Sequence, residues 1–196
     1  QETRFISSLP QSTSPAVAGG DPSPKTALGV YHAILTCVRT ALHRSNIEGV
    51  SVAVQGLGGV GYHLCSYLHN AGATLVVADL NNELVNRAMD EFGARAVSPS
   101  DILSQEVDVL APCAFGGIFN TQTINKLRTK IIAGGANNQL LRNEDGVHLQ
   151  ERNILYAPDF IVNAGGVINI SAEYYGSQTD EEVTNRVINI GDTLNE

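Results

Sequence analysis

Short apolar runs and longer amphipathic runs alternate along most of the chain. The short runs are almost wholly apolar, which is typical of strands that are buried on both faces of a parallel sheet. They predict strands at residues 51–55, 74–78, 94–97, 107–113, 130–133 and 154–157. The amphipathic runs predict helices at residues 25–43, 59–71, 82–92, 99–103, 121–127, 143–152, 167–175 and 180–196.

This alternation predicts the α/β class, as a Rossmann-type doubly wound and mainly parallel sheet with helices on both faces. Ser23 is the expected N-cap of the first helix, Asn81 or Asn82 that of the third, and Gly93 ends the third. Residues 1–24 are rich in Ser, Pro and Gly, so we expect a linker or loop remnant from a preceding domain there. Residues 25–196 are expected to form one dinucleotide-binding domain.

The composition is that of a globular protein, with 43% apolar and 16% charged residues. A net charge of -8 argues against nucleic acid or an anionic membrane surface as a partner. Cys37, Cys65 and Cys113 lie far apart and form no metal motif, so buried free thiols in a reducing compartment are expected. With no transmembrane run and no signal peptide, a cytoplasmic protein is predicted. The first residue is not Met and the end resembles an unfinished helix, so we expect both ends to be cut.

The strand at 51–55 runs into a glycine cluster with the spacing G-x-G-x-x-G, formed by Gly56, Gly58 and Gly61. Gly56 would allow the tight turn, Gly58 would let the backbone approach a pyrophosphate, and Gly61 would let the helix pack on the strand. The amino terminus of the following helix then favours the phosphates. A glycine turn that binds nothing is the alternative, but the strand, helix and later acid supply the context of a dinucleotide site.

That acid is Asp79, which ends the second strand. A carboxylate there accepts hydrogen bonds from the adenosine ribose hydroxyls and repels a 2′-phosphate. No Arg or Lys follows at residues 80–82, so NAD is favoured over NADP. A plain acid near the start of the next helix is the other interpretation.

Further contacts should come from loops at the carboxyl ends of the strands, at residues 112–114, 134–138 and 163–167. Asn138 and Asn163 are either hydrogen-bonding groups of the site or simple turn formers. The lysines lie outside these loops, the histidines fall in predicted helices, and no basic residue near Cys113 would lower its thiol pKa. We therefore predict no catalytic residue and no metal site, as in a cofactor domain without its catalytic half.

The strings at residues 22–30, 52–61, 111–117, 133–140 and 156–169 occur in an order that resembles the NAD-binding domain of the glutamate/leucine/phenylalanine/valine dehydrogenase family. The resemblance is closest to the leucine dehydrogenase branch. It implies reversible oxidative deamination of an L-amino acid with NAD, a homo-oligomeric parent enzyme, and a small-molecule amino acid or 2-oxo acid as substrate. A stand-alone, non-catalytic NAD-binding or regulatory module is the alternative.

The resemblance also assigns roles to individual residues. The pyrophosphate would be bound by Gly56, Leu57, Gly58, Gly59, Val60, Gly61 and Tyr62, and the cofactor would also meet Asp79, Thr26, Cys113, Ala114 and Asn138. Thr26 would contact the nicotinamide carboxamide and Asn138 the nicotinamide ribose. Asn163 would face the polar head of the substrate, and the apolar Val167 would favour an aliphatic or aromatic side chain. The branch usually has Asn where this chain has Gly59, and the catalytic amino-terminal domain of the family is absent from this sequence.

Overall fold

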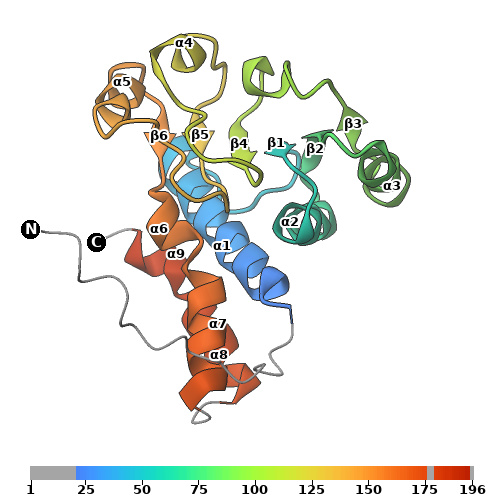
Figure 1. The fold of residues 1–196 in the computed structure, drawn as a ribbon, viewed down its shortest axis with the longest axis vertical. Coiled ribbons are helices and arrows are strands. Elements are labelled where there is room, and N and C mark those ends of the chain that lie inside the picture. Colours follow the sequence, from blue (N-terminus) through green and yellow to red (C-terminus); the bar gives the residue numbers. More distant parts are fainter. Residues whose placement is uncertain (1–20, 176–178, 195–196) are drawn as a thin grey trace, which may run out of the picture.

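The computed structural model describes residues 21–175 and 179–194, and its centre is a parallel sheet (Figure 1). The strands are β1 (Ser51–Gln55), β2 (Thr74–Ala78), β3 (Arg95–Ala96), β4 (Val109–Pro112), β5 (Ile131–Ile132) and β6 (Leu155–Tyr156). They lie in the order β3-β2-β1-β4-β5-β6, and each neighbouring pair is parallel. This order is that of the Rossmann fold, so the predicted doubly wound α/β architecture is confirmed.

In the described part of the chain, one helix precedes the first strand, four helices and a 3-10 turn lie between successive strands, and the last four helices follow β6. The helices are α1 (Ser23–Leu42), α2 (Gly59–Asn70), α3 (Asn82–Phe92), α4 (Thr121–Ile124), α5 (Asp145–Glu151), α6 (Asp159–Val162), α7 (Ala164–Tyr175), α8 (Asp180–Ile188) and α9 (Ile190–Thr193), with a 3-10 turn η1 (Ile102–Ser104). The predicted bounds of β1 and β2 are confirmed. The four later strands are all shorter than predicted.

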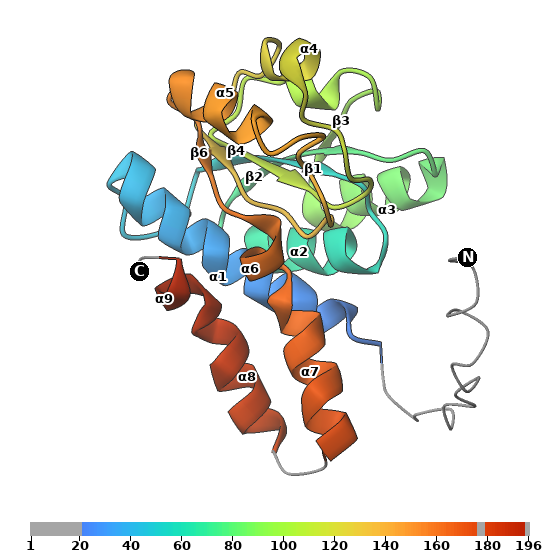
Figure 2. The same ribbon diagram turned by 60° about the vertical axis from the view of Figure 1, so that its left-hand side comes forward.

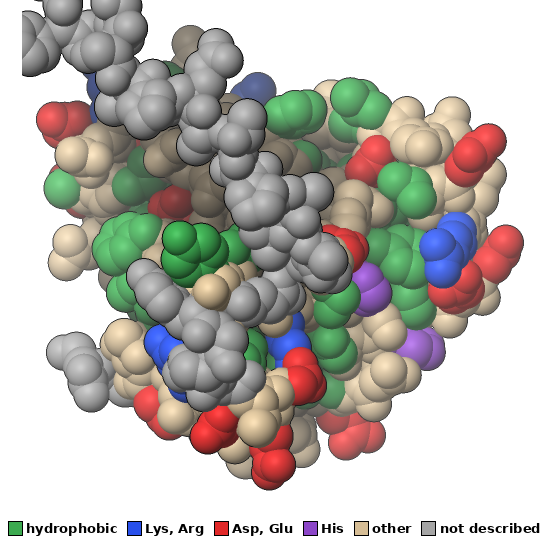
Figure 3. Space-filling model, turned by 60° about the horizontal axis from the view of Figure 1, so that its bottom comes forward, with side chains coloured by type: hydrophobic (Ala, Val, Ile, Leu, Met, Phe, Trp, Pro, Cys, Tyr) green, Lys and Arg blue, Asp and Glu red, His purple; other side chains and the backbone are tan. Residues whose placement is uncertain are grey.

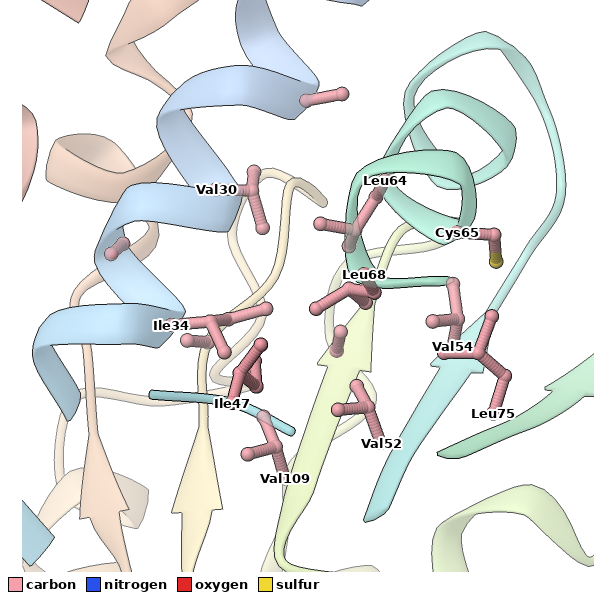
Figure 4. Close-up of a cluster of buried hydrophobic side chains, with 14 of the residues drawn as sticks. Val30, Ile34, Ile47, Val52, Val54, Leu64, Cys65, Leu68, Leu75 and Val109 are labelled. Atoms are coloured by element: carbon pink, nitrogen blue, oxygen red, sulfur yellow. The ribbon is translucent and has the colours of Figure 1, made fainter. Parts of the chain in front are cut away.

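Both faces of the sheet are covered, because alternate residues of each strand join opposite clusters. Val52 and Val54 pack with α1 and α2, whereas Ala53 packs with residues of α4 and α5. Figure 2 shows α1 and α2 on one side of the sheet and α4 and α5 on the other. In Figure 4, Val30 and Ile34 of α1 point toward Leu64 and Leu68 of α2 over the sheet. The apolar runs of the sequence are therefore explained by burial on both faces.

The ends of α3 follow the sequence prediction. Asn81 caps α3, since its side-chain oxygen accepts the Glu83 N–H at 2.9 Å, and Gly93 ends the helix with φ of +61°. The N-cap prediction for α1 is wrong. Ser23 is already the first helical residue, and its own N–H donates to Asp21 Oδ1 at 2.9 Å.

The predicted loop at residues 163–167 is mostly helical, because α7 begins at Ala164. Glycine usually weakens a helix, so Gly165 and Gly166 suggested a turn. A Cβ added at Gly165 would lie 2.4 Å from the Lys25 carbonyl oxygen. These glycines therefore serve close packing of α7 against α1, a requirement set by tertiary structure. The single helix predicted at 180–196 is also wrong, since Asn189 separates α8 from α9.

The predicted linker falls mainly on residues 1–20, which lie outside the described residues. The part that is described, residues 21–24, enters α1 two residues earlier than the predicted boundary at Lys25. Among the described helices, none combines the length and the apolar character needed to cross a membrane.

Candidate cofactor-binding site

The candidate site lies at the carboxyl end of β1, whose two neighbours in the sheet are β2 and β4. The last residue of β1, Gln55, pairs with Ala78 on one side and Pro112 on the other. From β1 the chain continues to β2 and β3 on one side of the sheet, and then returns to β4 on the other side of β1. Ligands of open α/β sheets bind at such a switch point in the strand order.

The three glycines of the turn have different surroundings. Gly56 has a φ of +91°, and a Cβ there would lie 2.7 Å from the Ala114 Cβ. A Cβ at Gly61 would lie only 1.9 Å from the Gly56 carbonyl oxygen, so α2 packs directly on the turn. A Cβ at Gly58 would meet nothing within 4 Å. Two of the glycines are therefore required by the fold, whereas Gly58 leaves space open for a ligand.

The amino terminus of α2 faces this open space. Gly58 is its N-cap residue, and no side chain caps the helix. The first amide groups of a helix have no partner within the helix, and the helix dipole adds partial positive charge there. The start of α2, at Gly59 and Val60, is thus suited to hold a phosphate group.

The carboxylate of Asp79 is attached to the glycine turn. Its Oδ2 accepts the Leu57 N–H at 2.6 Å, and its Oδ1 accepts the Asn81 N–H at 2.8 Å. The second bond agrees with the alternative interpretation, in which Asp79 is simply an acid near the start of α3. The N-cap of α3, however, is Asn81. Asp79 therefore links β2 to the turn, which places a half-buried carboxylate beside the open space.

The opposite side of the site is formed by loops that follow β5 and β6. Asn138 has a left-handed backbone with φ of +51°, and its N–H donates to Asp159 Oδ2 at 2.7 Å. Asn163 Nδ2 donates to Asn137 Oδ1 at 2.6 Å. The two predicted asparagines are thus brought to one region, each held by a residue that the sequence did not suggest.

Three helix amino termini converge beside the turn. A Cβ at Gly59 would lie 2.4 Å from the Ser23 Oγ of α1, and one at Gly166 of α7 would lie 2.6 Å from the Thr26 Oγ1. Thr26 is buried and its hydroxyl donates to the Pro22 carbonyl. Ser23 therefore occupies the space that a side chain at residue 59 would need.

Tyr62 and Val167 lie apart from this centre. The ring of Tyr62 packs against Phe92, 5.1 Å between centroids, with the Arg87 guanidinium 4.2 Å above it, so its side chain faces α3. Val167 is 69% exposed, on a face of α7 that it shares with Ile170. Figure 3 views the molecule from the α7 and α8 end, where hydrophobic side chains lie at the surface.

Neither Cys113 nor Lys25 has the properties of a reacting group. Burial raises the pKa of the Cys113 thiol to about 11, so the thiolate is scarce at neutral pH. Lys25 Nζ lies 2.8 Å from Asp180 Oδ1 and joins α1 to α8. The backbone of Cys113 has a structural role, because its N–H donates to the Gln55 carbonyl at 2.7 Å.

Sequence reasoning assigned no individual role to Asp159, Asn137, Gln139 or Gly166, although Asn137 and Gly166 lie within the predicted loops at 134–138 and 163–167. Gln139 is fully buried, and its Nε2 donates to the Gly134 and Ala136 carbonyls at 2.8 and 3.0 Å, which shapes the loop after β5. Asp159 follows the carboxyl end of β6, and that position was the one available signal. The other three are identified only by contacts between distant segments.

Comparison with known proteins adds to this geometry. Residues 77–195 match the profile of the family described as Glutamate/Leucine/Phenylalanine/Valine dehydrogenase. A leucine dehydrogenase from Geobacillus stearothermophilus is 50% identical over 177 residues, which is 90% of this chain and 47% of that protein. A phenylalanine dehydrogenase from Bacillus thermotolerans is 41% identical over 181 residues, again 90% and 47%.

A solved structure agrees with the fold. The crystal structure of L-tryptophan dehydrogenase from Nostoc punctiforme matches with a TM-score of 0.86 at 42% identity, covering 89% of this chain and 53% of that chain. The chain thus spans about half the length of the curated relatives that it matches.

Proposed function

Because the chain belongs to the glutamate/leucine/phenylalanine/valine dehydrogenase family, we propose that it is the cofactor-binding half of an NAD-dependent L-amino acid dehydrogenase. The parent enzyme would convert a branched-chain or other hydrophobic L-amino acid, NAD and water into a 2-oxo acid, ammonia, NADH and a proton. Residues 25–196 would be the NAD-binding domain. The coverage of about half of each relative supports the division into two halves.

The glycine turn is the observation that carries this proposal. Gly58 leaves open space at the uncapped start of α2, and Asp79 is bonded to the same turn through the Leu57 N–H. In the proposal, the pyrophosphate lies over Gly58, Gly59 and Val60, and the adenosine ribose lies beside Asp79. This arrangement fits a dinucleotide, because its phosphates would bind at the start of α2 while its ribose binds the carboxylate of Asp79.

Members of this family use a nicotinamide cofactor, and we propose NAD as the form used here. The Asp79 carboxylate would repel the 2′-phosphate of NADP. Residues 80–82 offer no Lys or Arg to bind that phosphate, and Leu80 is 77% exposed. Charge and sequence therefore support the same preference.

The choice of a hydrophobic substrate rests on the relatives and on one residue. The similar proteins are named leucine, phenylalanine and tryptophan dehydrogenases. Val167 offers an exposed apolar side chain near the α7 amino terminus, and Asn163 is the proposed contact of the substrate's polar head. Thr26 and Asn138 would hold the nicotinamide end, with Cys113 and Ala114 at the edge of the turn.

The bound cofactor would accept a hydride from the α-carbon of the amino acid. The residues of this chain bind and orient, whereas the group that accepts the proton is proposed to belong to the half of the parent that this chain does not cover. A cytoplasmic location and a homo-oligomeric parent stay predictions.

An activity assay of the full-length parent tests the proposal. We expect NAD-dependent oxidation of leucine, valine or an aromatic amino acid, with glutamate and NADP much poorer, and no turnover by this chain alone. A preference for glutamate would contradict the substrate class. Turnover by the isolated chain would contradict the proposal that the group that accepts the proton belongs to the other half of the parent enzyme.

A further inference from the structure

Asp159 connects two loops at the carboxyl edge of the sheet. It is the first residue of α6, separated from β6 by Ala157 and Pro158. Its Oδ2 accepts the Asn138 N–H at 2.7 Å, and its Oδ1 accepts the Tyr156 hydroxyl at 2.9 Å. Both oxygens of the carboxylate are thus engaged, one by the loop after β5 and one by β6 itself.

The other end of α6 holds the neighbouring asparagine. Asn163, the C-cap residue of α6, donates from its Nδ2 to Asn137 Oδ1 at 2.6 Å. The pair Asn137 and Asn138 is therefore fixed from both ends of one short helix. α6 and this pair form a clamp, in which the contact from Asp159 is the charged one and the stronger of the two.

The clamp holds Asn138 in a left-handed backbone conformation. Its φ is +51°, in a region where Asn is one of the few L-residues found often. Its carbonyl accepts the Gly117 N–H at 2.6 Å, and a Cβ at Gly116 would lie 2.8 Å from that same oxygen. Asp159 therefore orders the loop after β4 as well, through Asn138.

The position of this clamp relates it to one half of the cofactor. Asp79 follows β2 and the glycine turn follows β1, so the adenosine half lies toward β2 and the pyrophosphate lies over β1. In the sheet order, the other side of β1 is occupied by β4, β5 and β6. The remaining nicotinamide half must extend over the loops that Asp159 holds together.

We infer that Asp159 is a positioning residue for the nicotinamide half of the cofactor, acting through the backbone of Asn138. This inference rests on the proposed function. In this inference Asp159 acts through the Asn138 N–H and the loop that it holds, not on the reacting atoms. Its effect is to hold Asn138 and the loop at 116–117 in the form that receives this half of the ligand.

Binding of two ligands to the chain tests the inference. NADH probes both halves of the site, whereas ADP-ribose lacks the nicotinamide and probes only the adenosine half. For Asp159→Ala we expect NADH affinity to fall by roughly 10-fold, as for loss of one charge-assisted hydrogen bond. ADP-ribose affinity should stay within about 2-fold, because Asp79 and the glycine turn are untouched.

Two variants separate positioning from a general structural role. Asp159→Asn keeps an oxygen that can accept the Asn138 N–H, so it should recover most of the NADH affinity. Tyr156→Phe removes the other partner of Asp159 and should bind both ligands as the unmodified chain does. Asp159→Ser keeps a polar side chain at the start of α6, but this side chain is too short to reach Asn138, so the variant repeats the test if the alanine variant fails to fold.

The outcomes are distinct. The inference would be overturned by any of three results: unchanged NADH affinity in the alanine and serine variants, an equal loss of affinity for NADH and ADP-ribose, or unfolding of both variants. In each case, NADH binding by the unmodified chain would still uphold the proposed function. Failure of the unmodified chain to bind NADH would overturn the proposed function and, with it, this inference.

Discussion

The two sides of the candidate site are built in different ways. The side proposed for the adenosine half, the adenosine side, consists of one β-α-β unit at residues 51–79, in which the glycine turn, α2 and Asp79 lie within a short stretch of chain. The side proposed for the nicotinamide half, the nicotinamide side, is assembled from the start of α1, the loops after β4 and β5, α6 and the start of α7. The first side is a local structure, whereas the second exists only after distant segments have come together.

The strands reflect the same difference. β1 and β2 have five residues each and pair along their full length, whereas β5 and β6 have two residues each. The loops on the nicotinamide side are therefore held mainly by side-chain contacts such as those of Asp159 and Gln139. Substitutions on the two sides should accordingly have different consequences for stability and for binding.

The largest effect is expected at Gly61. In Gly61→Ala the new Cβ would collide with the Gly56 carbonyl, so α2 must move off the turn. Overpacking of this kind should lower the free energy of unfolding by about 3 kcal/mol and abolish NADH binding. Urea denaturation and an NADH titration measure the two effects. A variant as stable as the unmodified chain would show that the turn is not packed as described.

Gly58→Ala is the matched control on the same turn, with a smaller effect. Its Cβ enters open space at a φ of -63°, so stability should change by less than about 1 kcal/mol. The added methyl group would stand where the pyrophosphate approaches, and NADH affinity should fall about 100-fold. Equal NADH affinity in Gly58→Ala and in the unmodified chain would refute the proposed placement of the phosphates.

Asp79→Asn tests the charge on the adenosine side. The amide oxygen can still accept the Leu57 N–H, so the turn keeps its shape. NADH affinity should fall by roughly 10-fold, and the ratio of NADPH to NADH affinity should rise because the negative charge is gone. Competition titrations with both cofactors measure this ratio. If it is unchanged, Asp79 does not discriminate against the 2′-phosphate.

The smallest effect concerns pH and the core that both sides share. Burial raises the pKa of the Cys37 and Cys113 thiols from 9.0 to about 11. Above pH 9 the folded chain therefore keeps thiol protons that the unfolded chain has released, so the contribution of these thiols to stability should be constant below pH 9 and should fall as the pH rises toward 11. Melting temperatures across this range measure the slope, which should be shallower in Cys37→Ala. An increase in stability above pH 9 would contradict this sign.

The fold and the adenosine side could be predicted because their determinants are local. Apolar runs define β1 and β2, and the spacing of Gly56, Gly58 and Gly61 with Asp79 defines the turn. Asn138 and Asn163 were suggested by their loops at the ends of strands, whereas the resemblance to a known family supplied Thr26 and the role of each residue. The structure brings these three to the same edge of the sheet, where their roles stay predictions.

What could not be predicted depends on contacts across the chain. Gly165 and Gly166 resemble a turn in sequence but are helical, because α1 approaches them closely. Asp159 is one carboxylate among many until the structure shows it bonded to Asn138. Tyr62 belongs to the motif by position, yet its ring packs on Phe92. Sequence spacing specifies the turn, but it does not specify which distant segments meet it.

The central claim is that this chain binds NAD through the glycine turn and Asp79. It is tested most directly by a fluorescence titration of NADH with the chain, which contains no Trp to contribute background emission. The account predicts saturable one-to-one binding, with NADPH weaker by at least about 10-fold. Absence of saturable NADH binding, or NADPH binding at equal or greater affinity, would contradict it.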